Sequence, residues 1–303
     1  MSATVPLEWV TQRCHLPPSA SDTAMPFKNI LLQLSTYPHP SPDNVVSASI
    51  AIAKMLGGNL TAAVCQVELP DTSNRLVGFV TDVTSVIAAA RRDGAAAAAI
   101  LKRRLTEAGK NGYPSVTIID RACLPSHTGS QLMGNGRLSD LIIIPTSDDP
   151  AYREIAEDLI FGSGRPVLLL PESVAAEITL KVVVVAWDGS RVAARAISDA
   201  LPFLKFAQTV RLVEITGEKP LEGASSIAAL QQQLVSHDVK AVIDAIEVGD
   251  LGAGGALTGY CAEKHADLLV MGAFGHTRIR DFVLGGVTKF IVHHTPLPVL
   301  MTH

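Results

Sequence analysis

Short, continuous runs of Val, Ile, Leu and Ala recur along this chain, and segments with helical periodicity separate them. The runs lie at residues 29–34, 60–69, 115–121, 141–145 and 167–170, and again at 181–186, 209–215, 241–248, 267–271 and 299–301. A strand that is apolar on both sides must be covered on both faces, which is the situation of parallel strands in α/β proteins. The pattern therefore predicts parallel sheets with helices on both faces.

The segments between the runs carry helix signals. Val45, Ala48 and Ile52 recur at helical spacing before Gly57, and the alanine-rich residues 84–108 favour a helix by propensity. Further helices are predicted at 191–204, 225–237, 253–265 and 289–294. Because both halves repeat one order of elements, we expect an α/β fold of two tandem doubly wound parallel-sheet domains. The predicted divisions are a flexible extension over 1–24, a first domain over 25–174 and a second over 175–303.

Composition agrees with a globular protein of nearly balanced charge. The 303 residues suggest two domains, each long enough to bury a core. With 25 basic and 29 acidic residues the net charge is -4, so nucleic acid is not an expected partner. The apolar runs are too short to cross a bilayer and no secretory signal pattern is present, so we expect no membrane partner and a cytoplasmic location. Met1 and Met25 are both compatible with the native start.

Cysteine and histidine spacing predicts no metal centre. The cysteines, at positions 14, 65, 123 and 261, form no Cys-x-x-Cys pair, which is typical of reduced thiols rather than of disulfides or zinc ligands. Cys65 falls in a predicted core strand, where we expect a small buried apolar residue. His293 and His294 are neighbours on a predicted helix and no carboxylate accompanies them, so we expect surface or capping roles.

A glycine-spaced turn follows one of the apolar runs. Residues 268–271 lead directly into Gly272 and Gly275, and nine residues later Gly285 and Gly286 precede a helical pattern. Glycine lets the backbone approach a ligand closely, and a helix N-terminus offers unpaired N–H groups and a partial positive charge. The pattern predicts a site for an anionic nucleotide.

Asp188 marks a second part of the same predicted site. It ends the first strand of the second half, and Gly189 and Ser190 turn the chain into the next helix. In doubly wound sheets, ligands bind beyond the carboxyl ends of the strands where the strand order reverses. Asp188 or Ser190 could instead only cap that helix, and capping is compatible with ligand contact.

The glycine spacing, with residues 182–190 before it and 294–300 after it, resembles the nucleotide-binding motif of the universal stress protein family. The similarity covers residues 180–303, and residues 25–171 look like a second, degenerate copy, as in tandem members of that family. The family usually places Ser or Thr after its last glycine, whereas this chain has Gly286 there, and Thr288 is the nearest hydroxyl. The resemblance implies a Rossmann-like, adenine-nucleotide alpha hydrolase-like fold. It assigns the site to Ala186, Asp188, Glu214, Ile215, Gly272, Gly275, His276, Gly285, Gly286, Val287 and Thr288.

The resemblance implies a stress-response protein that binds ATP, with Mg²⁺ or Mn²⁺, and regulates partners according to nucleotide occupancy. The chain has no Gly-x-Ser-x-Gly elbow and no Walker loop with lysine, so we do not expect a dedicated enzyme, and any ATP hydrolysis would be slow. The alternative is a nucleotide-independent interaction protein with a vestigial glycine loop.

The first half lacks the glycine spacing. After its fourth apolar run the chain continues with Thr146, Ser147, Asp148, Asp149 and Pro150, where Asp149 is expected to cap a helix that begins with proline. These carboxylates would occupy the place of a phosphate, so we expect one nucleotide per chain. We also expect the final strands of the two halves, 167–170 and 299–301, to dock as an internal pseudo-dimer, with a homodimer of chains as a further assembly.

Overall fold

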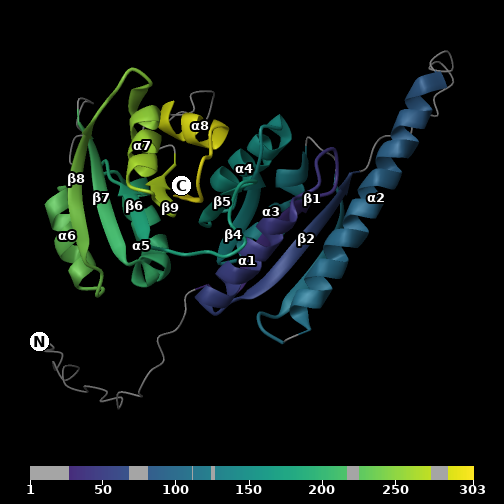
Figure 1. Cartoon of the computed structure of the whole chain (residues 1–303), viewed down its shortest axis with the longest axis horizontal. Coiled ribbons are helices and arrows are strands. Elements are labelled where there is room, and N and C mark those ends of the chain that lie inside the picture. Colours follow the sequence, from purple (N-terminus) through teal and green to yellow (C-terminus); the bar gives the residue numbers. More distant parts are fainter. Residues whose placement is uncertain (1–26, 68–80, 111, 124–126, 217–224, 274–285) are drawn as a thin grey trace, which may run out of the picture.

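The computed structural model describes residues 27–67, 81–110, 112–123, 127–216, 225–273 and 286–303. Its strands form one sheet of ten, in the order β3-β2-β1-β4-β5-β10-β9-β6-β7-β8 (Figure 1). The strands of the first half are β1 (Asn29–Ser35), β2 (Asn59–Val67), β3 (Val116–Cys123), β4 (Leu141–Thr146) and β5 (Val167–Pro171). Those of the second half are β6 (Val182–Ala186), β7 (Thr209–Thr216), β8 (Ala241–Glu247), β9 (Leu268–Gly272) and β10 (Val299–Thr302). Every predicted run is a strand.

The helices cover both faces of the sheet. Those of the first half are α1 (Asp43–Leu56), α2 (Thr81–Gly109), α3 (Thr128–Leu138) and α4 (Pro150–Gly162). Those of the second half are α5 (Arg191–Phe206), α6 (Ile227–Val235), α7 (Gly252–Glu263) and α8 (Gly286–His293). One apolar core lies beneath α1, α2, α5 and α6, and the other lies beneath α3, α4, α7 and α8. Figure 1 also shows α2 projecting past the end of the sheet.

The two halves repeat one strand order and meet at their last strands. β1 lies between β2 and β4, and β6 lies between β7 and β9, with parallel pairing throughout each half. β5 and β10 pair antiparallel, with Leu169 opposite Val299 and Leu168 opposite Leu300. The predicted α/β fold and the docking through the last strands are confirmed. The two predicted sheets join into one continuous sheet. The domain boundary near residue 174 stays a prediction.

Sequence patterns do not predict α3, because glycines at 129, 134 and 136 lower its helix propensity. The packing explains two of them. A Cβ on Gly129 would lie 2.5 Å from the Asp158 Cβ of α4, and a Cβ on Gly136 would lie 3.0 Å from the Ile142 side chain. Close approach of α3 to its neighbours therefore requires residues that are poor helix formers.

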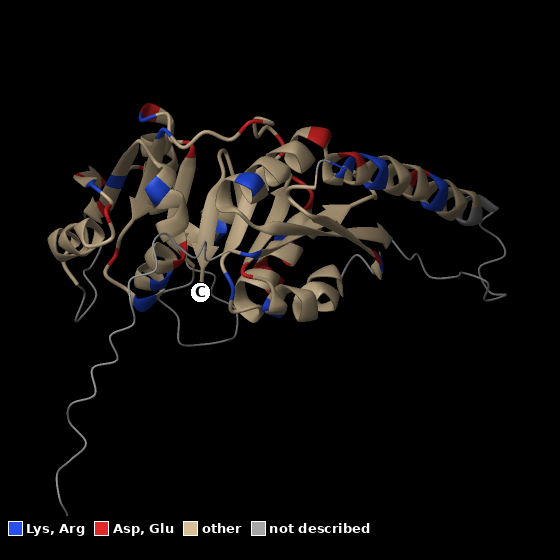
Figure 2. Cartoon of the chain, turned by 90° about the horizontal axis from the view of Figure 1, so that it is seen from below, with Lys and Arg blue, Asp and Glu red and all other residues tan. Residues whose placement is uncertain are grey.

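The surface charges are mixed in sign. Figure 2 shows basic and acidic residues interspersed along α2 and over both halves. Among the described residues, none of the helices combines the length and the apolar character that a membrane span requires.

Candidate functional site

The candidate nucleotide site lies where β6 and β9 end. These neighbouring strands are parallel, with Val183 opposite Leu268 and Val185 opposite Val270, so their carboxyl ends share one edge of the sheet. The strand order reverses between them, because β6 continues to β7 on one side while β9 continues to β10 on the other. The reversal point of a doubly wound sheet is where such folds form a ligand crevice. Asp188 lies two residues after the end of β6, and Gly272 is the last residue of β9.

Local hydrogen bonds hold the turn at Asp188. The Asp188 Oδ1 atom accepts from the Ser190 N–H at 2.9 Å, and Gly189 has a positive φ of 74°. The Ser190 hydroxyl oxygen caps α5 by accepting from the Ala193 N–H at 3.2 Å. The capping role considered for these residues is therefore present in the structure. It fixes the Asp188 carboxylate at the rim of the β6–β9 edge.

Gly272 has a packing role that sequence reasoning missed. A Cβ at this position would lie 2.6 Å from the Ala193 backbone nitrogen and 2.7 Å from the Val192 carbonyl carbon. The end of β9 thus runs against the first turn of α5, where only glycine fits. Approach to a phosphate remains a separate prediction for this residue.

The residue after Gly272 is held by the end of β10. The Ala273 N–H donates to the Thr302 carbonyl at 2.8 Å, and the Ala273 carbonyl accepts from His303 Nδ1 at 3.0 Å. Ala273 is fully buried. The glycine-containing segment therefore leaves the sheet from a point at which both backbone polar groups are paired. No local sequence pattern predicts these hydrogen bonds, because Thr302 and His303 lie 29 and 30 residues after Ala273.

The other predicted site residues fall into four groups. Ala186, Ile215 and Val287 lie against the core beneath α7 and α8. Glu214 is exposed, and strand alternation turns it toward the α5 and α6 face, away from Ile215. Gly286 is the exposed first residue of α8 and Thr288 is buried in its first turn. Gly275, His276 and Gly285 lie outside the described residues.

The corresponding edge of the first half differs in chemistry. The register of β1 with β4 places Ser35 where the second half has Asp188, and Thr146 where it has Ala273. The Asp149 Oδ1 atom caps α4 by accepting from the Ala151 N–H at 2.9 Å, and Pro150 begins that helix, as predicted. Only residues 147–149 join β4 to α4, whereas residues 273–285 join β9 to α8. The first half has no room for a comparable glycine loop.

Buried polar groups fill this edge of the first half. Gln33 is fully buried and donates to the Ser35 hydroxyl at 2.8 Å, while Tyr152, which is 3% exposed, donates to the His39 carbonyl at 3.0 Å. Burial raises the pKa of the Tyr152 phenol, against hydrogen bonds from Ser41 and Ser35 that lower it. Gln33 Oε1 and Thr146 Oγ1 are buried without a hydrogen-bond partner. The buried groups at this edge are thus polar and uncharged, and the Asp149 carboxylate lies beside them at the start of α4.

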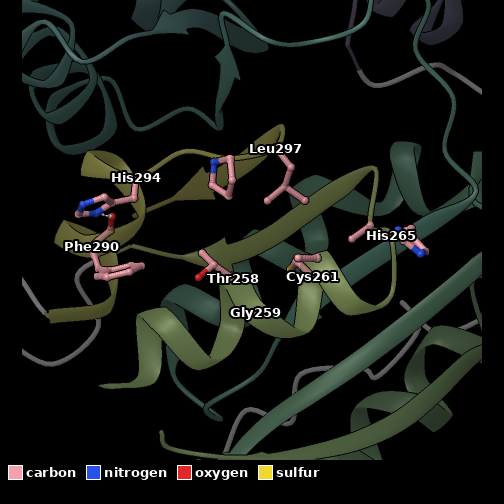
Figure 3. A pocket seen from close by; sticks show the side chains of 10 residues that line it. Thr258, Gly259, Cys261, His265, Phe290, His294 and Leu297 are labelled. Atoms are coloured by element: carbon pink, nitrogen blue, oxygen red, sulfur yellow. Dashed lines mark hydrogen bonds between the residues drawn. The ribbon is translucent and has the colours of Figure 1, made fainter. Parts of the chain in front are cut away.

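A hollow of about 520 Å³ between α7 and α8 lies elsewhere (Figure 3). Its lining includes Cys261 of α7, Phe290 of α8, His265 and His294, which follow these helices, and Leu297. The end of α7 and Leu297 immediately precede β9 and β10, so the hollow sits at the amino ends of these strands. The Asp188 edge is at their carboxyl ends. The hollow is therefore separate from the candidate nucleotide site.

The described cysteines are buried thiols. Cys65, Cys123 and Cys261 are free, and burial raises the pKa of the Cys261 thiol to about 12. The pKa of Cys65 is raised first by its hydrogen bond with Cys123 and then by burial. Because the thiolate is the reactive form, these residues act as small apolar core residues, as predicted for Cys65. In the part of the chain that the structure describes, no group of three or more His, Cys, Asp or Glu could hold a metal ion.

Comparison with known proteins agrees with this arrangement. Residues 179–303 match the family model described as the universal stress protein family. The chain is 30% identical over 147 residues to universal stress protein Slr1230 of Synechocystis sp., a match that covers 48% of this chain and only 49% of that relative.

Solved structures extend the similarity to both halves. A universal stress protein from Archaeoglobus fulgidus superposes with a TM-score of 0.61 at 14% identity, covering 92% of this chain and 97% of the other. One from Pseudomonas aeruginosa UCBPP-PA14 has a TM-score of 0.55 at 16% identity and covers 92% and 94%. Such identities establish the fold alone. Residues 179–303 thus match the universal stress protein family, and both halves of the chain share the fold of solved universal stress proteins.

Proposed function

We propose that this protein is a cytoplasmic nucleotide-dependent regulator that binds ATP, or a related adenine nucleotide, in its second half. The observation that carries the proposal is that Asp188, after β6, and Gly272, at the end of β9, lie at the same edge of the sheet. The strand order reverses at this point. Family membership of residues 179–303 supports it. Occupancy of this site would alter contacts with partners, including a second copy of the chain.

Each part of the site has a chemical task in this proposal. Ala186 and Ile215, which border the core, provide an apolar wall for the base. The Asp188 carboxylate accepts hydrogen bonds from the ribose hydroxyls. The first turn of α8, from Gly286, directs N–H groups and the positive helix end at the phosphates.

A divalent cation fits the donor set. Mg²⁺ and Mn²⁺ prefer oxygen ligands, which Asp188 and the nucleotide phosphates together provide. The proposal is for binding, and turnover of ATP would be slow. The competing function is that of an interaction protein that binds no nucleotide. Gly286 favours this alternative, because the family usually has a hydroxyl residue at that position.

Two measurements separate these functions. Heat-denatured purified protein is examined by mass spectrometry for released adenine nucleotide, and calorimetry measures the Kd of ATP with Mg²⁺. Asp188→Asn should weaken binding about ten- to a hundredfold, since a hydrogen bond to a charged group contributes about 1.5–3 kcal/mol. Asp43→Asn, an exposed aspartate of α1 in the first half, is the control. If the parent releases no nucleotide and gives no heat of binding, the result favours the interaction protein.

A further inference from the structure

A stripe of residues on α4 of the first half faces the second half. This α4 stripe consists of Arg153, Glu157 and Phe161, which are spaced by four and therefore share one side of the helix. Burial raises the pKa of Glu157, and the Lys289 ammonium of α8 opposes that rise. Burial lowers the pKa of His293, and the Arg153 guanidinium lowers it further.

The contact between α4 and α8 brings these charged groups close together. The helical layers of the two halves therefore meet at this stripe.

Phe161 is linked through the His303 side chain to Ala273, the residue at which the glycine-containing segment leaves the sheet. Its ring meets the ring of His303 edge-on, with centroids 5.1 Å apart and planes at 67°. His303 in turn donates from Nδ1 to the Ala273 carbonyl at 3.0 Å. Edge-to-face contact restricts the imidazole ring. A restricted ring keeps the Ala273 carbonyl in one orientation, and with it the direction in which the chain leaves β9.

We propose that the first half positions the nucleotide site of the second half through Phe161, His303 and Ala273. The proposal rests on the proposed function. His303 is a positioning residue, because it holds the Ala273 backbone, from which the glycine-containing segment begins. A fixed end of β9 needs less rearrangement when a ligand binds beside Asp188, so the contact raises affinity. The first half thus contributes to nucleotide binding without having the glycine spacing itself.

A double-mutant cycle on ATP affinity tests the link. Phe161→Ala and His303→Ala should each weaken binding about two- to tenfold, the range expected from one aromatic pair or one hydrogen bond. The double variant should bind no more weakly than His303→Ala alone, because Phe161 acts through His303. His303→Asn keeps an N–H donor near the position of Nδ1, so it should recover part of the affinity and be insensitive to Phe161→Ala.

The matched control is Phe206→Ala. Phe206 ends α5 and is 45% exposed, close to the 46% of Phe161, so both substitutions remove a similar half-exposed ring. Fully additive losses in the double variant, or parent-like affinity in both single variants, would overturn the proposal.

Hydrogen exchange gives a readout that does not need nucleotide. The Ala273 amide, bonded to Thr302, should exchange faster in Phe161→Ala and His303→Ala than in the parent or in Phe206→Ala. Unchanged exchange at this amide would refute the link even if the protein proves not to bind ATP. Absence of binding in the parent would instead contradict the proposed function.

Discussion

A residue that the sequence suggests for ligand binding can also be required by the packing of the fold. Gly272 was expected in a phosphate loop, and it is also the only residue type that fits between β9 and the first turn of α5. Backbone atoms on both sides of this contact cannot move as a flexible side chain would. The candidate site is therefore built on a close contact of the fold, and the proposed binding would depend on a residue that the packing also requires.

Gly272→Ala should lower the free energy of unfolding by about 1–3 kcal/mol, the range for overpacked positions. Urea denaturation monitored by circular dichroism measures the change. Gly259→Ala is the control, because Gly259 lies in α7 with nothing within 4 Å of its added Cβ. Alanine in a helix interior should leave that variant slightly more stable, by about 0.5–1 kcal/mol. Equal stability of Gly272→Ala and the parent would contradict the packing role.

At the scale of elements, α4 and α8 form the contact that joins the helical layers of the two halves. Burial is the largest cause that lowers the pKa of His293, and the charges of Arg153 of α4, Lys289 of α8 and the adjacent His294 lower it further. A cationic imidazole is therefore disfavoured at this contact. The folded protein holds His293 neutral at a pH at which the unfolded chain would be protonated.

This arrangement predicts an acid-sensitive contact. The pKa of His293 lies below its ordinary value of 6.5 in the folded state, so the unfolded chain binds more protons between that lowered pKa and 6.5. The free energy of unfolding should then fall as pH drops below about 6.5. Glu157, whose pKa is raised above 4.5, contributes the opposite slope at lower pH.

The measurement is urea unfolding of the parent and of His293→Gln at pH 7.5 and pH 5.5. The parent should lose more stability between these values than the variant, in which this proton uptake is absent. Identical losses in both proteins would show that His293 does not contribute.

At the scale of the whole molecule, a continuous sheet carries two edges of opposite character. Both halves reverse their strand order at the same place, between β1 and β4 and between β6 and β9. The second half has Asp188 and a long connection to α8 at this edge. The first half has Ser35, the closely packed Tyr152, and Asp149 already capping α4. A carboxylate at the helix N-terminus satisfies the positive end of α4 and repels an incoming phosphate.

The chain should therefore bind one adenine nucleotide. Calorimetry with ATP and Mg²⁺ on the full chain should give a stoichiometry near one, and Asp188→Asn should weaken that single event. A stoichiometry near two would contradict the assignment of Asp149 and the short β4–α4 connection as barriers to phosphate.

Sequence alone determined the elements and their class. The strands were predictable because parallel strands covered on both faces must be apolar throughout, and the cap at Asp149 because an Asp-Pro pair has few other uses at a helix start. Burial of Cys65 followed from its place in such a strand. Asp188 could be placed at the rim because the carboxyl ends of parallel strands share one edge.

Only the tertiary structure decided how these elements pack against one another. Packing between elements decided the antiparallel register of β5 with β10, the fit of Gly272 against α5, and the hydrogen bond from His303 to Ala273. α3 forms although its glycines disfavour a helix, because close packing against α4 and β4 outweighs local propensity. Periodicity reports which side of an element is buried, but it carries no information about the neighbour that the element buries itself against.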